Sequence, residues 1–197
     1  MSHDARAYLD NNATTRLAPE VLEAMLPYLR DQYANPSSQH LFGSETRKRV
    51  DAAREALAAA VGARASEIVF TSGGTESDNF ALRSVLAARP RRPKIVTVAT
   101  EHPAVLDTAG DLARHGAEVV VVGVDRHGSV DLDALAEAVD DRTALVSCMW
   151  ANNETGVIAP LAAVAEIAKA AGAFMHVDAV QAIGKVPVDV RALPIDL

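Results

Sequence analysis

The sequence predicts an α/β fold in which a mostly parallel sheet carries helices on both of its faces. Two observations favour this class. From about residue 66 onward, short runs that are apolar throughout alternate with segments of helical period. Strands buried on both faces have this continuous apolar character, and strands separated by helices are typical of a parallel sheet. With 197 residues and 49% hydrophobic composition, the chain can bury one substantial core.

Strands and helices are expected in strict alternation along this part of the chain. Pro103 and Pro160 suit a first helical turn, and Gly172 is suited to end the last helix. The expected strands are 68–70, 95–99, 118–122, 144–149 and 173–177, and the expected helices are 75–88, one starting near 103, 131–139 and 160–171.

The amino-terminal part of the chain has a different pattern. We assign residues 1–65 to an amino-terminal arm with its own helices and residues 66–197 to the α/β domain. A helix is expected over 19–30, which Pro27 should kink or shorten, and a longer amphipathic helix over 45–61. A loop by composition separates the two helices.

The last residues of the chain suggest an unfinished sheet. A new apolar run starts at Ile195 and stops at Leu197. A parallel sheet rarely ends on a strand just begun, so we expect the α/β domain to be truncated at its carboxyl terminus and the chain to be the first part of a longer protein.

Composition excludes several classes of protein. The chain has 19 Lys and Arg against 26 Asp and Glu, a formal net charge of −7, so it is a poor candidate for binding nucleic acid. The single cysteine, Cys148, excludes an internal disulfide framework and a cysteine-based zinc site. No apolar run reaches the roughly 18–20 residues that a membrane span requires, and residues 1–6 lack the apolar core of a signal peptide. We therefore expect a cytoplasmic protein without a nucleic-acid or membrane partner.

Polar segments follow the expected strands, at the point where each strand ends. Ligands of open α/β sheets bind just beyond the carboxyl ends of the strands, so these segments form the candidate site. They could also be ordinary polar loops. The segments are 71–76, 100–102, 150–156 and 178–181.

The run Ser72-Gly73-Gly74-Thr75 lies between an expected strand and the amino terminus of a helix. Two glycines let the backbone approach a ligand, and the free N–H groups and the helix dipole favour an anion, so a phosphate is the natural guest. The run is neither a dinucleotide fingerprint nor a P-loop. Taken alone, it could equally be a simple turn.

Asp178 ends an apolar strand, where an unpaired carboxylate is costly. The protonated ring nitrogen of a pyridine cofactor would satisfy it, as would a core arginine. His102 could act as a general acid or base, stack on a ring, or be structural. His176 is better explained as a satisfied core histidine, and no metal-ligand spacing accompanies these residues, so no metal site is expected.

These motifs, in this order, closely resemble the amino-terminal half of cysteine desulfurases, which are pyridoxal 5′-phosphate (PLP) enzymes of the class-V aminotransferase family with fold-type-I architecture. Stretches 10–12 and 149–152, with Pro103, are most similar to the nitrogen-fixation branch, NifS. The matching stretches are 8–15, 35–38 with His40 and 42–43, 68–79, 101–106, 150–156 and 176–187.

The resemblance implies a role for each matching site residue. Gly74 and Thr75 would bind the cofactor phosphate, and His102 would stack on the ring and assist proton transfer. Asp178 would pair with the ring nitrogen, and Gln181 would hydrogen-bond the ring hydroxyl.

The resemblance also implies an activity and its partners. Asn153 would lie near the ring hydroxyl and the substrate. The family removes sulfur from L-cysteine, giving L-alanine and an enzyme persulfide, and passes the sulfur to an iron–sulfur scaffold protein. In the NifS branch this serves nitrogenase. Fold-type-I enzymes resemble one another in being homodimers.

The sequence departs from the family pattern in what it lacks. The family's Schiff-base lysine, nucleophilic cysteine and carboxylate-binding arginine have no counterpart here, and Cys148 lies in mid-strand. We therefore expect this chain to be an inactive fragment of a desulfurase. Alternatives are another class-V enzyme (a selenocysteine lyase or an aminotransferase) or a non-catalytic binding or dimerisation module. The lysines present are Lys48, Lys94, Lys169 and Lys185.

Overall fold

The computed structural model describes residues 7–197. Residues 1–6, in which no signal peptide is expected, lie outside the described part. The chain divides into two compact units. The first, called here the amino-terminal unit, runs to residue 59 and includes 64–68; the second, called the sheet unit, comprises 60–63 and 69–197.

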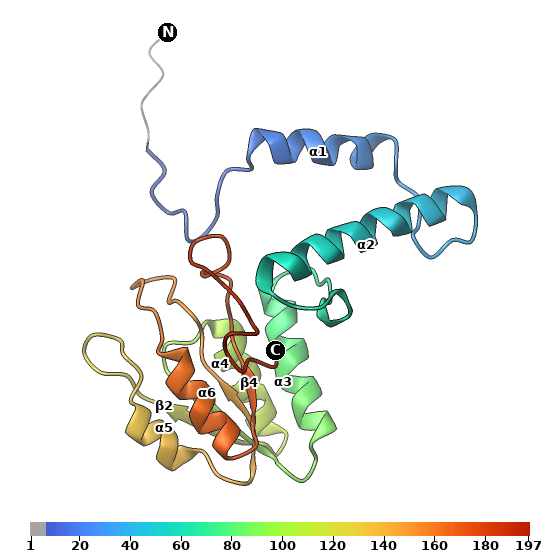
Figure 1. Ribbon diagram of the computed structural model, residues 1–197. Coiled ribbons are helices and arrows are strands. Elements are labelled where there is room, and N and C mark those ends of the chain that lie inside the picture. Colours follow the sequence, from blue (N-terminus) through green and yellow to red (C-terminus); the bar gives the residue numbers. More distant parts are fainter. Residues whose placement is uncertain (1–6) are drawn as a thin grey trace. The chain divides into compact units, whose positions relative to one another are not determined.

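The amino-terminal unit is helical, as Figure 1 shows. Helix α1 spans Pro19–Arg30, α2 spans Leu41–Val61, and the short 3₁₀ helix η1 spans Ala65–Glu67. The expectation that Pro27 shortens α1 is wrong, because the Pro27 carbonyl accepts the Asp31 N–H at 2.8 Å and continues the last turn.

Helix α2 begins four residues earlier than the sequence pattern predicts, at 41 rather than 45. The ring of His40 accepts the backbone N–H of Gly43 at 3.3 Å. It thereby satisfies one of the N–H groups that have no acceptor within the first turn of a helix. Histidine is not among the usual capping residues, which explains why the pattern placed the start too late.

The sheet unit contains four parallel strands in the order β2-β1-β3-β4. This arrangement confirms the predicted fold class. The strands are β1 (Lys94–Val98), β2 (Glu118–Val122), β3 (Thr143–Ser147) and β4 (Phe174–His176), and the helices are α3 (Gly74–Ala88), α4 (Pro103–Arg114), α5 (Leu132–Ala138) and α6 (Leu161–Ala170).

The predicted strand at 68–70 is wrong. Ile68 caps the carboxyl end of η1 in an extended conformation, but both neighbours of β1 in the sheet are other strands, β2 and β3. Val69 is 65% exposed. These three apolar residues have the sequence pattern of a buried strand, but no neighbouring strand within residues 7–197 is placed to pair with them. Apolar character alone does not supply hydrogen-bond partners.

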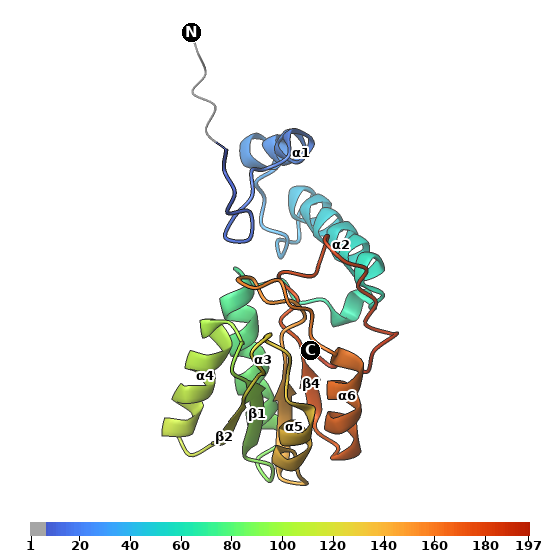
Figure 2. The ribbon, with the colours of Figure 1, turned by 90° about the vertical axis from the view of Figure 1, so that its left-hand side faces the viewer.

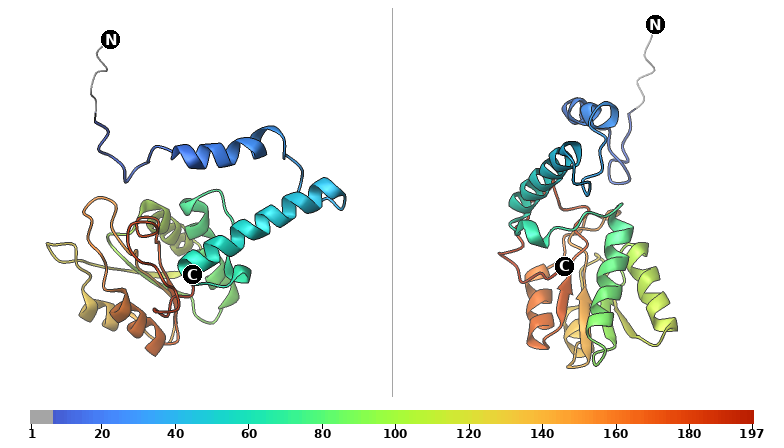
Figure 3. Two further views of the ribbon diagram at one scale, coloured as in Figure 1. Left: turned by 45° about the horizontal axis from the view of Figure 1, so that its top comes forward. Right: turned by 90° about the vertical axis from the view of Figure 1, so that its right-hand side faces the viewer.

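Two apolar cores lie on opposite faces of the sheet. Val96 and Val146 pack with α5 and α6, whereas their neighbours Ile95 and Leu145 pack with α3 and α4. Successive side chains of a strand point to opposite faces, so each fully buried strand contributes to both cores. Figure 2 and Figure 3 show the two helix pairs on the two sides of the sheet.

The end of the chain lies alongside β4. Leu197 donates its N–H to the Met175 carbonyl at 3.2 Å and accepts the Val177 N–H at 3.0 Å. This is the pattern of a parallel ladder, so the apolar run that starts at Ile195 begins to pair with the sheet. Within residues 7–197, no helix has both the length and the apolar character needed to cross a membrane.

Candidate active site

The sheet has a topological switch point beside β1. The chain leaves β1 towards β2 on one side and later returns to place β3 on the other side. Ligands of open α/β sheets bind at such a point, beyond the carboxyl ends of the strands. The site is therefore built from the loops that follow β1, β3 and β4 and from the amino end of α3.

Hydrogen bonds tie these loops together at the carboxyl edge. The Asn152 side chain donates to the Thr100 carbonyl at 3.0 Å, which joins the loops after β3 and β1. The Trp150 N–H donates to the Asp178 carbonyl at 2.9 Å, which joins the loops after β3 and β4. The edge is thus a connected surface rather than a set of independent loops.

The amino end of α3 leaves space for a ligand next to its first turn. A side chain added at Gly73 would meet nothing within 4 Å, whereas one added at Gly74 would lie 3.1 Å from Cγ2 of Val180. The start of α3 therefore lies against the segment that follows Asp178. Glu76 accepts both the N–H and the hydroxyl of Ser72 at 2.6 Å, and these hydrogen bonds lower its pKa.

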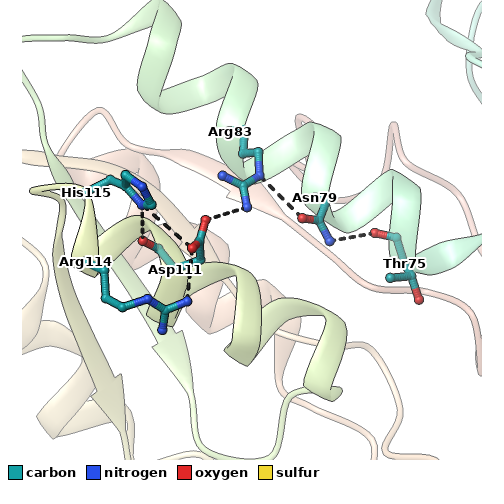
Figure 4. Close-up of polar contacts among 6 residues, drawn as sticks. All are labelled: Thr75, Asn79, Arg83, Asp111, Arg114 and His115. Carbon is teal, nitrogen blue, oxygen red and sulfur yellow. Dashed lines mark hydrogen bonds and ion pairs between the residues drawn. The ribbon is translucent and has the colours of Figure 1, made fainter.

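A polar ladder fixes α3 against α4, as Figure 4 shows. The Asn79 side chain donates to the Thr75 carbonyl at 3.0 Å and accepts from Arg83 at 3.4 Å. Arg83 also pairs with Asp111 of α4 at 2.8 Å, and this is the main cause of the lowered pKa of Asp111. The backbone of the first turn, where the phosphate was predicted, is thereby linked to the neighbouring helix.

His102 is the N-cap of α4. Its Nδ1 accepts the Ala104 N–H at 3.1 Å, so in the neutral ring the proton lies on Nε2. The residue is exposed at the carboxyl edge. Capping fixes the ring at one nitrogen while its other nitrogen and its faces remain suited to contact a ligand.

Asp178 is buried, with 8% of its surface exposed. Its carboxylate accepts the Val180 N–H at 2.9 Å, and within residues 7–197 it forms no ion pair with a lysine or an arginine. Burial raises its pKa, and the charge of Asp78 acts in the same direction. The Val180 hydrogen bond, His176 and His102 act in the opposite direction. Such a carboxylate is suited to a cationic ligand.

Asn153 and Gln181 also lie in loops of this edge. Asn153 belongs to a turn organised by Asn152, whose side-chain oxygen accepts the backbone N–H groups of Glu154 at 3.0 Å and Thr155 at 2.8 Å. Gln181 accepts a hydrogen bond from the ammonium group of Lys185. All predicted site residues therefore belong to the segments that form the carboxyl edge: Gly74, Thr75, His102, Asn153, Asp178 and Gln181.

Three buried polar residues of the site were given no role by the sequence analysis, although Glu101 lay in one of its candidate segments: Asp78, Glu101 and Ser147. Glu101 lies in the polar segment just after an apolar strand, a position similar to the one that singled out Asp178. Asp78 and Ser147 carried no such signal, because each belongs to a regular element whose polar residues are normally assigned to a solvated face.

Cys148 is buried beneath the edge, with 1% of its surface exposed. Burial, followed by the charge of Glu101, raises its thiol pKa to about 12. Because the thiolate is the reactive form, this thiol is inert at neutral pH. This environment agrees with the mid-strand position that the sequence predicts for Cys148.

A separate hollow of about 860 Å³ lies within the amino-terminal unit, lined by the segment that follows α1 and by residues of α2. Its lining includes His40, Phe42 and Arg49. None of the predicted site residues lines it, so the carboxyl edge of the sheet remains the candidate active site.

Comparisons with known proteins agree with this geometry. The family “Aminotransferase class-V” matches residues 7–197. The cysteine desulfurase of Cereibacter sphaeroides is 53% identical over 194 residues, covering 98% of this chain and 50% of that protein. A solved NifS-like protein is 44% identical with a TM-score of 0.94, covering 97% of this chain and 53% of that one. The structure of SspA in complex with cysteine is 34% identical with a TM-score of 0.91, covering 96% of this chain and 55% of that one.

The chain spans about half the length of the curated relatives it matches. Class-V aminotransferases and cysteine desulfurases depend on PLP, a cofactor that carries both a phosphate and a pyridine nitrogen. The agreement of family, fold and carboxyl-edge geometry shows that this chain belongs to the class-V aminotransferase family.

Proposed function

We propose that the protein to which these residues belong is a PLP-dependent cysteine desulfurase, which removes sulfur from L-cysteine and leaves L-alanine. The observation that carries the proposal is the meeting of a glycine-lined helix start with a buried carboxylate at one edge of the sheet. A Cβ at Gly74 would lie 3.1 Å from Val180, two residues after Asp178. The desulfurase relatives and the cysteine complex of SspA support the choice of substrate.

The amino end of α3 fits the phosphate of PLP. The N–H groups in the first turn of a helix have no acceptor within the helix, and the Ser72 N–H is already bound by Glu76. The first-turn N–H groups and the Thr75 hydroxyl are therefore the donors that we assign to the phosphate. Gly73, where an added side chain would meet open space, keeps the approach clear.

The buried carboxylate fits the pyridine nitrogen. We assign Asp178 to hold the proton on that nitrogen, His102 to stack on the ring and assist proton transfer, and Asn153 and Gln181 to contact the ring hydroxyl. When bound, PLP supplies an electron sink for the bonds of the substrate. Asp178 serves this chemistry by remaining ionised opposite a cation.

The remaining elements of the proposal concern partners. Sulfur released from cysteine would be carried as an enzyme persulfide to an iron–sulfur scaffold protein, with nitrogenase assembly as the use that the NifS-like relatives favour. We also propose that the protein is cytoplasmic and forms a homodimer. These assignments rest on the family resemblance.

Substitution of Asp178 tests the proposal. In the full-length protein, Asp178→Ala should weaken PLP binding by at least about 30-fold, or about 2 kcal/mol, because a charge pair is lost at a buried position. The measurement is a PLP titration by visible absorption, with L-alanine release from L-cysteine as the second readout. Asp133→Asn, which removes an exposed carboxylate from α5, is the matched control.

Two outcomes would contradict the proposal. Unchanged PLP affinity in Asp178→Ala would remove the assigned role of the carboxylate. Faster turnover of L-selenocysteine or of an amino donor than of L-cysteine by the unaltered protein would favour a selenocysteine lyase or an aminotransferase.

A further inference from the structure

A chain of buried polar side chains lies next to Asp178. His176 Nε2 lies 3.5 Å from Oδ1 of Asp78, and His176 Nδ1 lies 2.9 Å from Oγ of Ser147. Ser147 donates to Oε1 of Glu101 at 3.3 Å. Each of these four residues is at most 5% exposed, so water does not screen their charges.

The fold places the four residues at one level of the sheet. Ser147 and His176 end β3 and β4 and are partners in the parallel ladder. Both lie two residues beyond positions that pack against α3 and α4, namely Leu145 and Phe174, so they share that face. Asp78 comes from α3 and Glu101 from the loop after β1. The chain of contacts therefore crosses from α3 under the candidate site.

The protons of this chain follow from its hydrogen bonds. With the hydroxyl proton of Ser147 directed to Oε1 of Glu101, Nδ1 of His176 donates to Ser147, and a proton held by Glu101 lies on Oε2. Nε2 of the same ring faces the Asp78 carboxylate. An imidazole that donates at one nitrogen and faces a carboxylate at the other is suited to carry a proton on both nitrogens.

Against one histidine cation, three ionised carboxyl groups would leave two buried negative charges unpaired, and a proton on one carboxyl group would leave one. Asp78, Glu101 and Asp178 are all buried, and no lysine or arginine of residues 7–197 forms an ion pair with them. His176 is the imidazole that faces Asp78. A second positive charge near Asp178 could come only from a bound ligand or from His102. The exposed ring of His102 accepts a hydrogen bond at Nδ1.

Of the three carboxyl groups, Glu101 has the surroundings that stabilise a negative charge least. Its Oε2 is buried and has no hydrogen-bond partner among the described residues. Burial raises its pKa to about 8, with Asp178 and Asp78 acting in the same direction and the Met149 and Ser147 hydrogen bonds opposing them. Cys148 is buried in the core on the other face of the sheet, and burial keeps it a neutral thiol.

We propose that Asp78, His176, Ser147 and Glu101 form a buried positioning relay in which Glu101 is the neutral acid, His176 is the cation paired with Asp78, and Asp178 is thereby kept ionised for a cationic ligand. Only the identity of that ligand, the ring of PLP, rests on the proposed function. The protonation pattern belongs to the chain itself, so it can be measured without cofactor.

The first experiment measures the proton on Glu101 in the full-length, cofactor-free protein. Infrared spectra at pH 7 should contain the C=O stretch of a buried carboxylic acid, and Glu101→Gln should remove it. Glu137→Gln, at an exposed position of α5, should leave the band unchanged. A band that persists in Glu101→Gln, or that is missing from the unaltered protein, overturns the assignment of the proton.

The second experiment follows the ionisation of Asp178 by NMR of carboxyl-labelled aspartate, with the signal assigned by Asp178→Asn. His176→Gln removes the cation and should move the titration midpoint of Asp178 up by about 1–3 pH units. Asp78→Asn removes a neighbouring negative charge and should move the midpoint down. His115→Gln, on the exposed side of α4, is the control.

Opposite shifts of the Asp178 midpoint in the two variants distinguish a relay from general damage to the fold. Damage to the fold would shift the midpoint in the same direction in both variants. If His176→Gln does not fold, Asp78→Asn still tests the relay. A midpoint that does not change in Asp78→Asn, or that shifts upward, overturns it. Failure of the unaltered protein to bind PLP would refute the proposed function while leaving both measurements valid.

Discussion

Single residues of the site take their chemistry from their surroundings rather than from their type. Asp178 and Glu101 are both carboxyl groups that follow apolar strands. Asp178 accepts a backbone N–H, and the charges of two histidines act to lower its pKa, whereas Oε2 of Glu101 has no partner among the described residues. The same burial therefore leaves one group suited to hold a charge and the other suited to hold a proton.

The pH dependence of stability should report the proton on Glu101. Its pKa is about 8 in the folded protein against an ordinary 4.5, so the folded state binds the proton more tightly between these values. The free energy of unfolding should fall as the pH rises from about 4.5 to about 8. Glu101→Gln, which imitates the neutral acid, should show a smaller fall. Urea unfolding of both proteins across this pH range measures the fall in the free energy of unfolding.

The control for this prediction is Glu137→Gln, because it removes the same charge from an exposed position. Its unfolding curve should follow that of the unaltered protein. Parallel pH profiles for Glu101→Gln and the unaltered protein would contradict a proton held at Glu101.

At the scale of the elements, helix starts build the site. α3 starts at a pair of glycines, and α4 starts at the capping ring of His102. The ladder from Thr75 through Asn79 and Arg83 holds the first of these starts in place, and Figure 4 shows its continuation to α4. The residues proposed to contact the ligand are therefore positioned by the same hydrogen bonds that stabilise the first turns of α3 and α4.

Two substitutions separate the capping role of His102 from its proposed contact with the cofactor. His102→Ala removes the acceptor for the Ala104 N–H and should cost about 1 kcal/mol of stability. His102→Asn retains a capping oxygen and should remain close to the unaltered protein in stability. Both variants lose the ring, so both should show an altered absorption spectrum of bound PLP. Thermal unfolding and visible spectra of the full-length protein measure the two effects.

Equal stability of His102→Ala and the unaltered protein would show that the cap contributes little. An unaltered PLP spectrum in His102→Asn would contradict the stacking role while leaving the cap intact.

For the whole molecule, the parallel topology decides which residues meet. The switch point beside β1 gathers loops that are far apart in the sequence. Two lysines of the sheet unit are held in ion pairs, and Lys185, which lies next to Gln181, is outside the sequence context of the family's Schiff-base lysine. Lys94 is buried at the amino end of β1 against Asp140 at 2.9 Å, and Lys169 pairs with Asp196 at 2.5 Å. Lys48 lies in α2, and Lys185 donates to Gln181.

This distribution predicts that the 197-residue chain alone does not release L-alanine from L-cysteine in the presence of PLP. No lysine is in the family's Schiff-base context, and the Cys148 thiol has a pKa of about 12. Amino-acid analysis after incubation measures alanine, with PLP and cysteine without protein as the control. Alanine release that Lys185→Arg abolishes would contradict the prediction and assign that lysine a catalytic role.

Much of the fold and of the site could be predicted because buried parallel strands have a strong local signature. The strand at 118–122 was predicted with its observed bounds, and Asp131 was recognised at the start of α5. The strand at 68–70 was wrong because pairing depends on neighbours that are remote in sequence. The cap by His40 and the burial of Asp78 were missed for the same reason: each depends on a contact rather than on a pattern.

The sequence by itself determined the fold class, the starts of the helices in the sheet unit to within one residue and the polar residues at strand ends, because hydrophobic runs, prolines and glycines act through local backbone preferences. Only the tertiary structure decided that His176 lies between Asp78 and Ser147, that Glu101 has an oxygen without a partner, and that Cys148 is too buried to react. Charge and reactivity depend on burial and on neighbours brought together by the sheet, and neither can be read from a single position in the chain.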